Sequence, residues 1–400
     1  MPSKIEELVK AHDAWRSGRC INIQPSENLL SRAVRSVLSS DMAGRYTLRS
    51  NEFVLNNGAA NSYGGTRLMD EVESIGAETA SSLFHGAHAS LKPLSGHIAS
   101  LLMIASTCRS GDTIMAVSST DGGYDGYGGD YIPDLFSLRF EALPFDRSRW
   151  NIDSEAAAED IRAKKPKLVI LGQSFILFPY EMGPIRDACS ETGAILAYDA
   201  SHVMGLVVGG KFQDPIAEGA DIVVGSTHKS LPGPQGGLFV TGDDTIWREF
   251  SRNTTWRIID NAHWNRIAVV AQALIEMKRH GRSYAARIQS NSAALGGYLA
   301  EEGLECRFRE LGYSKSHQLH IDEERLREQK LTFGQMSALL EKNDIIVDTT
   351  GRLGTSEVSR LGMGKQEMKN IASLVTRALG GENVKSKANK LRRKFHAQFT

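Results

Sequence analysis

Short aliphatic runs recur along the middle of the chain, separated by connections long enough to form a helix. The strand candidates are TIMAV at 113–117, LVIL at 168–171, AILAY at 194–198, DIVV at 221–224 and LFV at 238–240. Strands rich in Val, Ile and Leu that alternate with helices are typical of a mainly parallel sheet with helices on both faces. The pattern therefore predicts an α/β fold.

Three segments before or between these strands have the signature of helices. Apolar residues recur at helical spacing in 69–84, and 98–106 is an almost wholly apolar helix candidate. GPIRDACSETG at 183–193 closes on Gly193, a residue type that commonly ends a helix.

A chain of 400 residues is long enough for two domains, because single cores rarely grow beyond about 250–300 residues. Residues 264–300 read as one long helix or two, and a mixed segment leads to a last helix near 365–379. We therefore predict an N-terminal arm at 1–25, a large domain at 26–265 and a smaller α+β domain at 266–400.

The charge balance argues against a nucleic-acid or membrane partner. Acidic and basic residues number 47 each, so no net field attracts a polyanion. The apolar segment at 267–275 falls well short of the ~20 residues that span a bilayer, and residues 1–20 lack the apolar core of a signal peptide. A cytoplasmic protein is the expectation. We interpret the basic stretch at 385–395 as a solvated helix face, since it has no interleaved aromatic residues.

The four cysteines, at positions 20, 108, 189 and 306, show no close pairing. Neither a zinc cluster nor a disulfide framework is indicated, and we expect reduced, mostly buried thiols and no bound metal.

Polar residues follow three successive strand candidates. Ser174 comes after the run at 168–171, Asp199 and His202 come after the next run, and Lys229 follows the run at 221–224. In an open parallel sheet the ligand lies outside the carboxyl ends of the strands. These four side chains are therefore expected to converge on one edge of the sheet.

These residue types suit pyridoxal phosphate. That cofactor needs a lysine for its Schiff base, a carboxylate for its pyridinium nitrogen and a donor at its phenolic oxygen, roles for Lys229, Asp199 and Ser174. Its phosphate needs free N–H groups such as those at a helix start. Ser95, Gly96 and His97 directly precede the helix candidate at 98–106.

Each of these residues has an ordinary explanation when taken alone. An aspartate after a strand is as often a helix N-cap, a Ser-Gly pair is usually a turn, and a single lysine usually lies on the surface. The joint placement of the residues favours a cofactor site.

A series of motifs then resembles one known family over nearly the whole chain. The motifs are PSEN (25–28), SYGGT (62–66), PLSG (93–96), DGGYDGYG (121–128), GQSF (172–175), DASHVMGL (199–206), STHKSLPGPQGG (226–237) and GRLGTSE (351–357). They are similar, in order and spacing, to those of serine hydroxymethyltransferases. The resemblance implies a fold-type I enzyme dependent on pyridoxal phosphate, with a large domain built on a mainly parallel sheet of the seven-stranded type and a smaller α+β domain. It also implies a homodimer whose active sites are shared between subunits.

The resemblance assigns a role to each matching residue. Lys229 matches the Schiff-base lysine, Asp199 the partner of the pyridine nitrogen, and Ser174 and His202 lie near the phenolic oxygen. The other cofactor positions are Ser95, Gly96, His97, Tyr124, Ser226 and His228. Arg352 matches the arginine that binds the substrate carboxylate, a task suited to a bidentate guanidinium. Ser26, Glu27, Tyr46 and Tyr63 complete the substrate side. The catalytic set is Lys229, Asp199, His202, Tyr124 and Tyr63.

The chain departs from the family where folate binds. A histidine that stacks on the cofactor ring is Tyr124 here, which can stack but is no imidazole acid or base. Two leucines of the folate pocket fall at Ser119 and Asp125. The glutamate needed for folate-dependent transfer aligns with Leu48, inside a segment that carries extra residues, and Glu52 is a displaced candidate.

Two further positions that surround the phosphate in the family also differ. The arginine of the family's GPRGG motif is Gln235, and TTWRIIDNAHWN replaces a glycine-rich loop that the partner subunit normally contributes.

The sequence therefore predicts an enzyme that makes or breaks the Cα–Cβ bond of a β-hydroxy-α-amino acid, with an amino acid and an aldehyde as its small-molecule partners. An aldolase or transaldolase fits the lost folate features, and hydroxymethyl transfer with tetrahydrofolate stays open. A second hypothesis is an aminotransferase or racemase on the same fold, which needs only Lys229, Asp199 and Arg352. A third is a non-catalytic binding protein, although such a protein has no need of a Schiff-base lysine.

Overall fold

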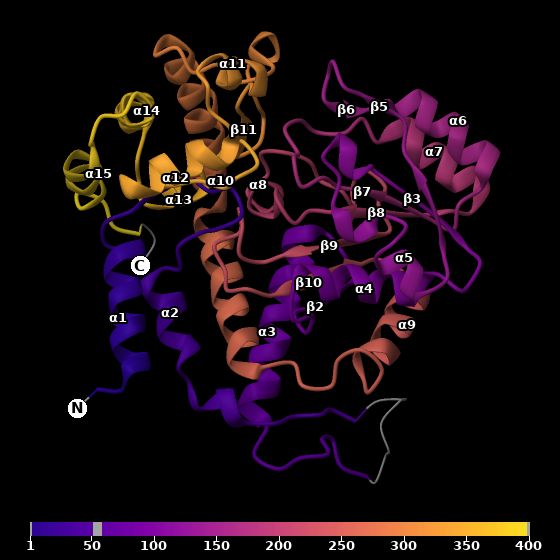
Figure 1. Ribbon diagram of the computed structural model, residues 1–400. Helices are drawn as coiled ribbons and strands as arrows, with labels where there is room; N and C mark the ends of the chain where they lie inside the picture. Colours follow the sequence, from indigo (N-terminus) through magenta and orange to yellow (C-terminus); the bar gives the residue numbers. More distant parts are fainter. Residues whose placement is uncertain (1, 51–57, 398–400) are drawn as a thin grey trace. The chain divides into compact units, whose positions relative to one another are not determined.

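The computed structural model describes residues 2–50 and 58–397; Glu52 lies outside the described residues. The chain divides into two compact units (Figure 1). Residues 32–282 form what we call the large unit, and residues 1–31 together with 283–400 form the small unit. The first residues of the chain thus belong with its C-terminal part. The domain boundaries expected from the sequence stay a prediction.

The large unit is built on a seven-stranded sheet of order β2-β10-β9-β8-β7-β3-β4. Its strands are β2 (His88–Ser90), β3 (Thr113–Ala116), β4 (Arg139–Ala142), β7 (Leu168–Leu171), β8 (Ile195–Asp199), β9 (Ile222–Ser226) and β10 (Gly237–Thr241). Strands β4, β3, β7, β8 and β9 pair in parallel, and β10 is antiparallel to both of its neighbours. The expected α/β class and mainly parallel sheet are confirmed.

Helices cover both faces of this sheet (Figure 1). The shorter helices of the large unit are α2 (Arg32–Leu38), α3 (Arg67–Phe84), α4 (Gly96–Thr107), α5 (Ile132–Leu135), α6 (Ser154–Lys164), α7 (Gly183–Thr192), α8 (Met204–Val208) and α9 (Asp244–Thr254). Alternate strand residues such as Ile114, Ile170 and Val224 share one buried cluster with Leu102 of α4 and Phe250 of α9. A strand turns successive side chains to opposite faces, so strands covered on both sides must be apolar throughout.

Short elements complete the large unit. They are the hairpin of β5 (Phe145–Asp146) and β6 (Asn151–Ile152) and the 3₁₀ turns at Asp41–Gly44, Ser119–Asp121 and Asp125–Tyr127. The strand β4 was not predicted, because RFEA is only partly buried and lacks the aliphatic run that marks the central strands.

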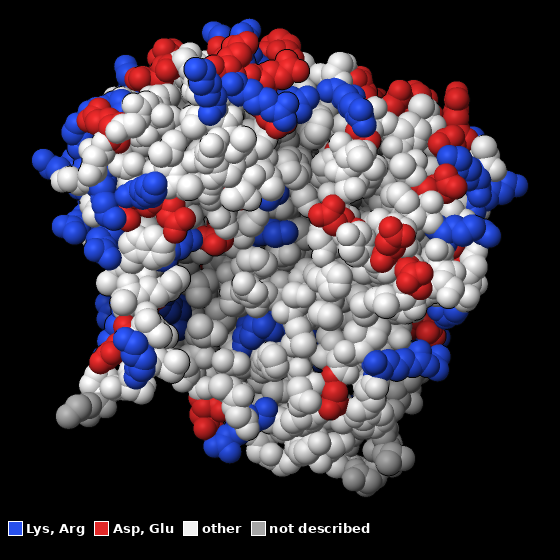
Figure 2. All heavy atoms as spheres, viewed as in Figure 1, with Lys and Arg blue, Asp and Glu red and all other residues white. Residues whose placement is uncertain are grey.

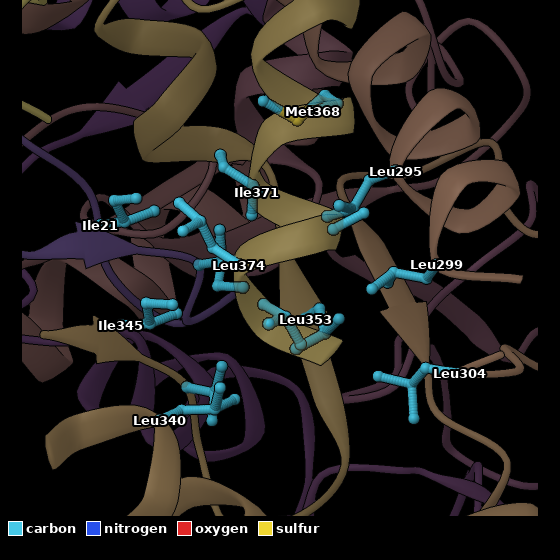
Figure 3. Packing of buried hydrophobic residues seen from close by; sticks show 14 of the residues in the cluster. Ile21, Leu295, Leu299, Leu304, Leu340, Ile345, Leu353, Met368, Ile371 and Leu374 are labelled. Carbon is cyan, nitrogen blue, oxygen red and sulfur yellow. The ribbon is translucent and has the colours of Figure 1, made fainter. Parts of the chain in front are cut away.

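The small unit has its own apolar core, shown in Figure 3. Its elements are α1 (Lys4–Arg16), β1 (Ile21–Asn22), β11 (Gln318–His320), α11 (Glu323–Glu328), α12 (Phe333–Lys342), β12 (Ile345–Ile346), β13 (Arg352–Gly354), α13 (Ser356–Arg360), α14 (Lys365–Leu379) and α15 (Lys385–Arg392), with a 3₁₀ turn at Arg309–Leu311. β1 pairs in parallel with β12, and β11 is antiparallel to β13. The boundary between the units falls within the long helix α10 (Trp264–Glu301).

The surface mixes both signs of charge. Figure 2 shows lysine and arginine side chains interspersed with aspartate and glutamate on the visible face, as the zero net charge leads one to expect. Within the described ranges, no helix combines the length and apolar character needed to cross a membrane. All four cysteines are free and buried, as predicted.

Glu357 of α13 makes the stability of the small unit depend on pH. Its carboxylate is 7% exposed and accepts a hydrogen bond of 2.7 Å from Asn22 Nδ2. Burial raises the pKa of Glu357 to about 7, against an ordinary value of 4.5. The folded state therefore holds the proton more tightly than the unfolded chain, and the stability from this group is lost as the pH rises from about 4.5 through about 7.

Glu357→Gln should therefore stabilise the fold more at pH 8 than at pH 5, by about 1–3 kcal/mol, because the neutral amide avoids a buried charge. Urea unfolding at both pH values measures the difference. The exposed Glu310→Gln serves as the control and should show no such pH dependence. An equal effect of Glu357→Gln at both pH values would contradict this account.

Candidate active site

The predicted residues meet in one small cavity of the large unit. The side chains that line it come from the carboxyl ends of β7, β8 and β9, from the segment after β3, and from the first turns of α4. The lining residues are Gly96, His97, Ser100, Tyr124, Gln173, Ser174, Asp199, Ser201, His202, Ser226 and Lys229. Eight of these were predicted as site residues from the sequence.

Asp199 is the last residue of β8 and is held through both carboxylate oxygens. Oδ1 accepts a hydrogen bond from the Ser201 backbone N–H at 2.9 Å, and Oδ2 accepts one from the Tyr127 hydroxyl at 2.8 Å. The carboxylate is only 8% exposed. Two donors thus fix the orientation of the carboxylate, a group that can pair with a protonated ring nitrogen.

The start of α4 has the features of an anion site. Ser95 caps the helix, accepting the Ile98 N–H on its Oγ at 3.1 Å. A Cβ on Gly96 would lie 2.2 Å from Ser226 Oγ, so only glycine lets the helix start approach the end of β9 this closely. The first N–H groups of a helix have no intrahelical acceptor, and the helix dipole favours an anion there.

His228 supplies a second sign that the site suits a phosphorylated ligand. Its Nδ1 is buried without a hydrogen-bond partner among the residues that the structure describes. Burial, and secondarily the adjacent Lys229, lower the pKa of His228 to about 4, so the ring is neutral near pH 7. A buried polar atom usually has a partner, and a ligand oxygen would provide one here.

Lys229 lies in the loop that follows β9. The backbone of Thr227 accepts from Gly233 N at 2.9 Å and donates to Gly236 O at 3.1 Å, which folds the glycine-proline segment back on itself. Ser226 at the strand end donates its N–H to Ser201 Oγ at 3.0 Å. The loop thus fixes the backbone on both sides of Lys229, whose side chain lines the cavity.

Tyr124 lines the same cavity and contacts His97. Its hydroxyl lies 2.7 Å from His97 Nδ1, and the two rings meet edge to face. Burial, and secondarily Asp199, raise the pKa of Tyr124. The phenol therefore stays protonated near neutral pH.

Tyr46 and Tyr63 do not line this cavity. They contact each other, with ring centroids 4.6 Å apart, and the Tyr46 hydroxyl donates to Asp260 at 2.7 Å. Tyr63 is 46% exposed. Both residues flank the segment that carries extra residues.

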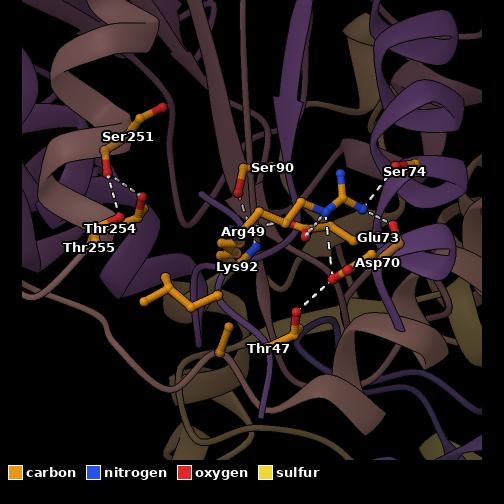
Figure 4. A network of polar contacts seen from close by, with 12 residues as sticks. Thr47, Arg49, Asp70, Glu73, Ser74, Ser90, Lys92, Ser251, Thr254 and Thr255 are labelled. Carbon is orange, nitrogen blue, oxygen red and sulfur yellow. Dashed lines mark hydrogen bonds and ion pairs between the residues drawn. The ribbon is translucent and has the colours of Figure 1, made fainter. Parts of the chain in front are cut away.

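The two arms of that segment pair like a hairpin. Ser62 N donates to Leu48 O at 2.9 Å and Ser50 N to Ala60 O at 3.0 Å. Figure 4 shows how one arm is attached to α3: Arg49 donates to Ser74 Oγ at 3.0 Å and lies 3.6 Å from the Asp70 carboxylate, to which Thr47 also donates.

The remaining predicted residues belong to the small unit. Arg352 begins β13, and its Nε donates to Asp348 Oδ2 at 2.8 Å. The same Nε lies 3.1 Å from Thr350 Oγ1, and these contacts orient the guanidinium. Glu27 pairs with Arg16 and accepts from Asn22 Nδ2 at 3.0 Å. Ser26 precedes it and is partly buried.

A larger cavity, of about 680 Å³, lies elsewhere in the large unit, between α3, β2 and α9. None of the predicted site residues lines it, and two of its three cations, Arg49 and Lys92, are engaged by Glu73. We place the chemistry in the smaller cavity because the lysine, the carboxylate and the helix start converge there.

Comparison with known proteins agrees with this geometry. The family model of serine hydroxymethyltransferase matches residues 2–375. The chain belongs to the serine hydroxymethyltransferase family. The enzyme of that name from Pyrobaculum neutrophilum is 34% identical over 95% of this chain and 89% of its own length. The one from Methanobrevibacter smithii is also 34% identical, over 99% of this chain and 94% of its own length.

A solved structure shares the fold. The crystal structure of L-threonine transaldolase from Pseudomonas fluorescens, in its internal aldimine state, superposes with a TM-score of 0.87. It covers 98% of this chain and 91% of that protein, at 23% sequence identity.

Membership in the family makes the chain a pyridoxal phosphate-dependent enzyme that acts on Cα–Cβ bonds. The sequence-based predictions of the family, the fold type and pyridoxal phosphate as a cofactor are therefore confirmed. This membership favours the Cα–Cβ hypothesis over the aminotransferase, racemase and binding-protein alternatives. Among the described residues, no group of three His, Cys, Asp or Glu side chains is placed to hold a metal ion.

Sequence reasoning missed four residues of the site. Ser100, Gln173 and Ser201 line the cavity, and Tyr127 binds Asp199. Two of them had a usable signal. Ser100 lies four residues after Gly96, hence on the same face of α4, and Ser201 follows the strand end by two positions. Tyr127 had none, because its contact depends on how the segment after β3 folds back.

Gly96→Ala should weaken pyridoxal phosphate binding by about tenfold or more, because the new methyl group forces Ser226 and the helix start apart. Equilibrium dialysis of the apoprotein measures the affinity. Gly183→Ala is the matched control: Gly183 also opens a helix, α7, but a Cβ there has no atom within 4 Å. Equal affinities for both variants would contradict the close approach at Gly96.

Proposed function

We propose that this enzyme exchanges the aldehyde part of a β-hydroxy-α-amino acid without folate, as an aldolase or transaldolase. The observation that carries the proposal is the polar surface beside Tyr124. Ser119 and Asp125, where the resemblance expects leucines of a folate pocket, are both exposed in the 3₁₀ turns that flank Tyr124. An apolar pteridine ring would gain little binding free energy from packing against these polar side chains.

Leu48 supports the same conclusion. It stands where the resemblance expects the glutamate of folate-dependent transfer, and its apolar side chain cannot move a proton. Its backbone is fixed in the hairpin by Asn61 Oδ1, which accepts the Leu48 N–H at 3.1 Å.

The fold allows this chemistry. The solved neighbour of similar fold is an L-threonine transaldolase, an analogy at the level of the fold alone.

The residues of the site have separate roles in this reaction. When bound, pyridoxal phosphate supplies an electron sink for the charge left on Cα. Lys229 would hold it covalently and would move a proton at the substrate Cα. Asp199 would pair with the ring nitrogen, and Ser174 and His202 would hold the phenolic oxygen. Tyr124 stacks on the ring, with its hydroxyl oriented by His97.

The remaining assignments concern the phosphate and the substrate. We assign the phosphate to Ser95, Gly96, His97, Ser226 and His228. Arg352 binds the substrate carboxylate together with Ser26, and Glu27, Tyr46 and Tyr63 lie on the substrate side.

In the forward step the Cα–Cβ bond breaks, the β-hydroxyl loses its proton and an aldehyde leaves. In the exchange step Cα attacks the carbonyl carbon of a second aldehyde, and the new β-oxygen regains a proton.

We also propose that the enzyme is a cytoplasmic homodimer. The large unit exposes several large apolar side chains, among them Leu68, Tyr131, Leu135 and Trp256. The homodimer is what the resemblance to the family implies, and size-exclusion chromatography with light scattering tests it.

The reaction is tested with serine, threonine and phenylserine as substrates of the pyridoxal phosphate-loaded enzyme. We expect aldehyde release from threonine or phenylserine without tetrahydrofolate, and incorporation of a second, added aldehyde into a new β-hydroxy-α-amino acid. Mass spectrometry after borohydride reduction should find the cofactor on Lys229. Hydroxymethyl transfer from serine only when tetrahydrofolate is added would refute the folate-free proposal, and no aldehyde from any substrate would refute the aldol chemistry.

Arg352→Lys should raise the KM for the amino acid by about 10- to 100-fold with a smaller change in kcat, because lysine loses the bidentate geometry that fits a carboxylate. Affinity for pyridoxal phosphate should not change. Arg309→Lys, at an exposed arginine of the same unit, is the control. An unchanged KM for Arg352→Lys would remove this residue from the substrate side.

A further inference from the structure

Tyr127 is a buried tyrosine in contact with the central carboxylate. It ends the 3₁₀ turn Asp125–Tyr127 and is 1% exposed. Its hydroxyl lies 2.8 Å from Asp199 Oδ2 and 2.7 Å from Ser100 Oγ. Ser100 belongs to α4, one turn after Gly96. Three elements, α4, β8 and the segment after β3, thus meet at one hydroxyl.

The direction of these hydrogen bonds follows from the groups involved. An ionised carboxylate only accepts, so the Tyr127 proton points to Asp199. Ser100 has one proton and two neighbours, the Gly96 carbonyl at 3.1 Å and the Tyr127 oxygen at 2.7 Å. Because Tyr127 donates its own proton to Asp199, Ser100 must be the donor in the 2.7 Å contact with Tyr127. The result is a series of hydrogen bonds that runs from Ser100 through Tyr127 to Asp199.

The surroundings of this hydrogen-bond series keep Tyr127 protonated. Burial, and secondarily the Asp199 charge, raise the pKa of Tyr127 well above its ordinary value, so the phenol keeps its proton. Aligned hydrogen bonds polarise one another where water is excluded, and Ser100 strengthens Tyr127 as a donor.

We propose that Tyr127 is a positioning residue that fixes and polarises Asp199 for the pyridine nitrogen of the cofactor. This inference rests on the cofactor assignment above and deepens it. The Ser201 N–H holds one carboxylate oxygen and Tyr127 holds the other. The carboxylate can then rotate toward neither side, and its negative charge is stabilised. A carboxylate held in this way would present a fixed acceptor to the ring nitrogen of the cofactor.

The hydroxyl can be tested apart from the ring. Tyr127 also packs edge to face against Tyr124, with ring centroids 5.3 Å apart. Tyr127→Phe keeps this packing and removes only the donor. Tyr198→Phe is a matched control, because Tyr198 is also fully buried and its hydroxyl donates to Gln213 at 3.0 Å, outside the site.

The experiment measures pyridoxal phosphate affinity of the apoproteins by equilibrium dialysis, the pH titration of the bound cofactor's visible absorption band, and thermal unfolding. We expect Tyr127→Phe to bind about ten- to a hundredfold more weakly, the range for a lost hydrogen bond to a charged group, and to shift the titration midpoint. Ser100→Ala should show a smaller change in the same direction. Tyr198→Phe should lose thermal stability to a similar extent without changing affinity or titration.

A double-mutant cycle tests whether Tyr127 acts through Asp199. In an Asp199→Asn background, Tyr127→Phe should cost little further affinity, because no charged carboxylate remains to be held. Wild-type affinity and an unshifted titration in Tyr127→Phe would overturn the inference, as would a full effect in the Asp199→Asn background. Failure of the wild-type protein to bind pyridoxal phosphate would overturn the cofactor assignment itself, and this inference with it.

Discussion

Parallel strand pairing is the constraint on which the site depends. In β7, β8 and β9 the register places Leu171 beside Tyr198 and Asp199 beside Val224, so the three strands end at nearly the same level. The register thereby brings the residues at or just after the strand ends to one edge of the sheet: Ser174, Asp199 with Ser201, and Lys229. Their side chains need not contact one another for this to happen. Strands buried on both faces hold this register firmly, since a slip by one residue would turn every apolar side chain to the wrong face.

The rest of the large unit completes that edge. α4 brings its N-terminus to the end of β9, which is feasible only because Gly96 has no side chain to meet Ser226. The segment after β3 also reaches this edge of the sheet. It places Tyr124 in the cavity and Tyr127 against Asp199. The glycine-proline loop after β9 returns the chain to β10, which runs antiparallel to both of its neighbours, so residues 227–236 join these two strands without a crossover helix.

Much of this arrangement could be predicted from the sequence because it depends on local patterns. The runs at 168–171 and 221–224 mark strands by their apolar character alone, and polar residues directly after them must lie at the edge of the sheet. The contact between Tyr127 and Asp199 could not be predicted, because it joins residues 72 positions apart through irregular backbone. The pairing of Tyr46 with Tyr63 and the anchoring of Arg49 on α3 are of the same kind: each depends on how a non-repetitive segment folds.

The site's central carboxylate also explains why two tyrosines occur together in DGGYDGYG. Tyr124 lines the cavity, whereas Tyr127 is fully enclosed and meets the first ring edge to face. Both phenols keep their protons near neutral pH, because burial and the Asp199 charge oppose ionisation of each. A histidine at either position would add a group that titrates in the physiological range. With tyrosines, neither of these two positions adds a group that changes charge in that range.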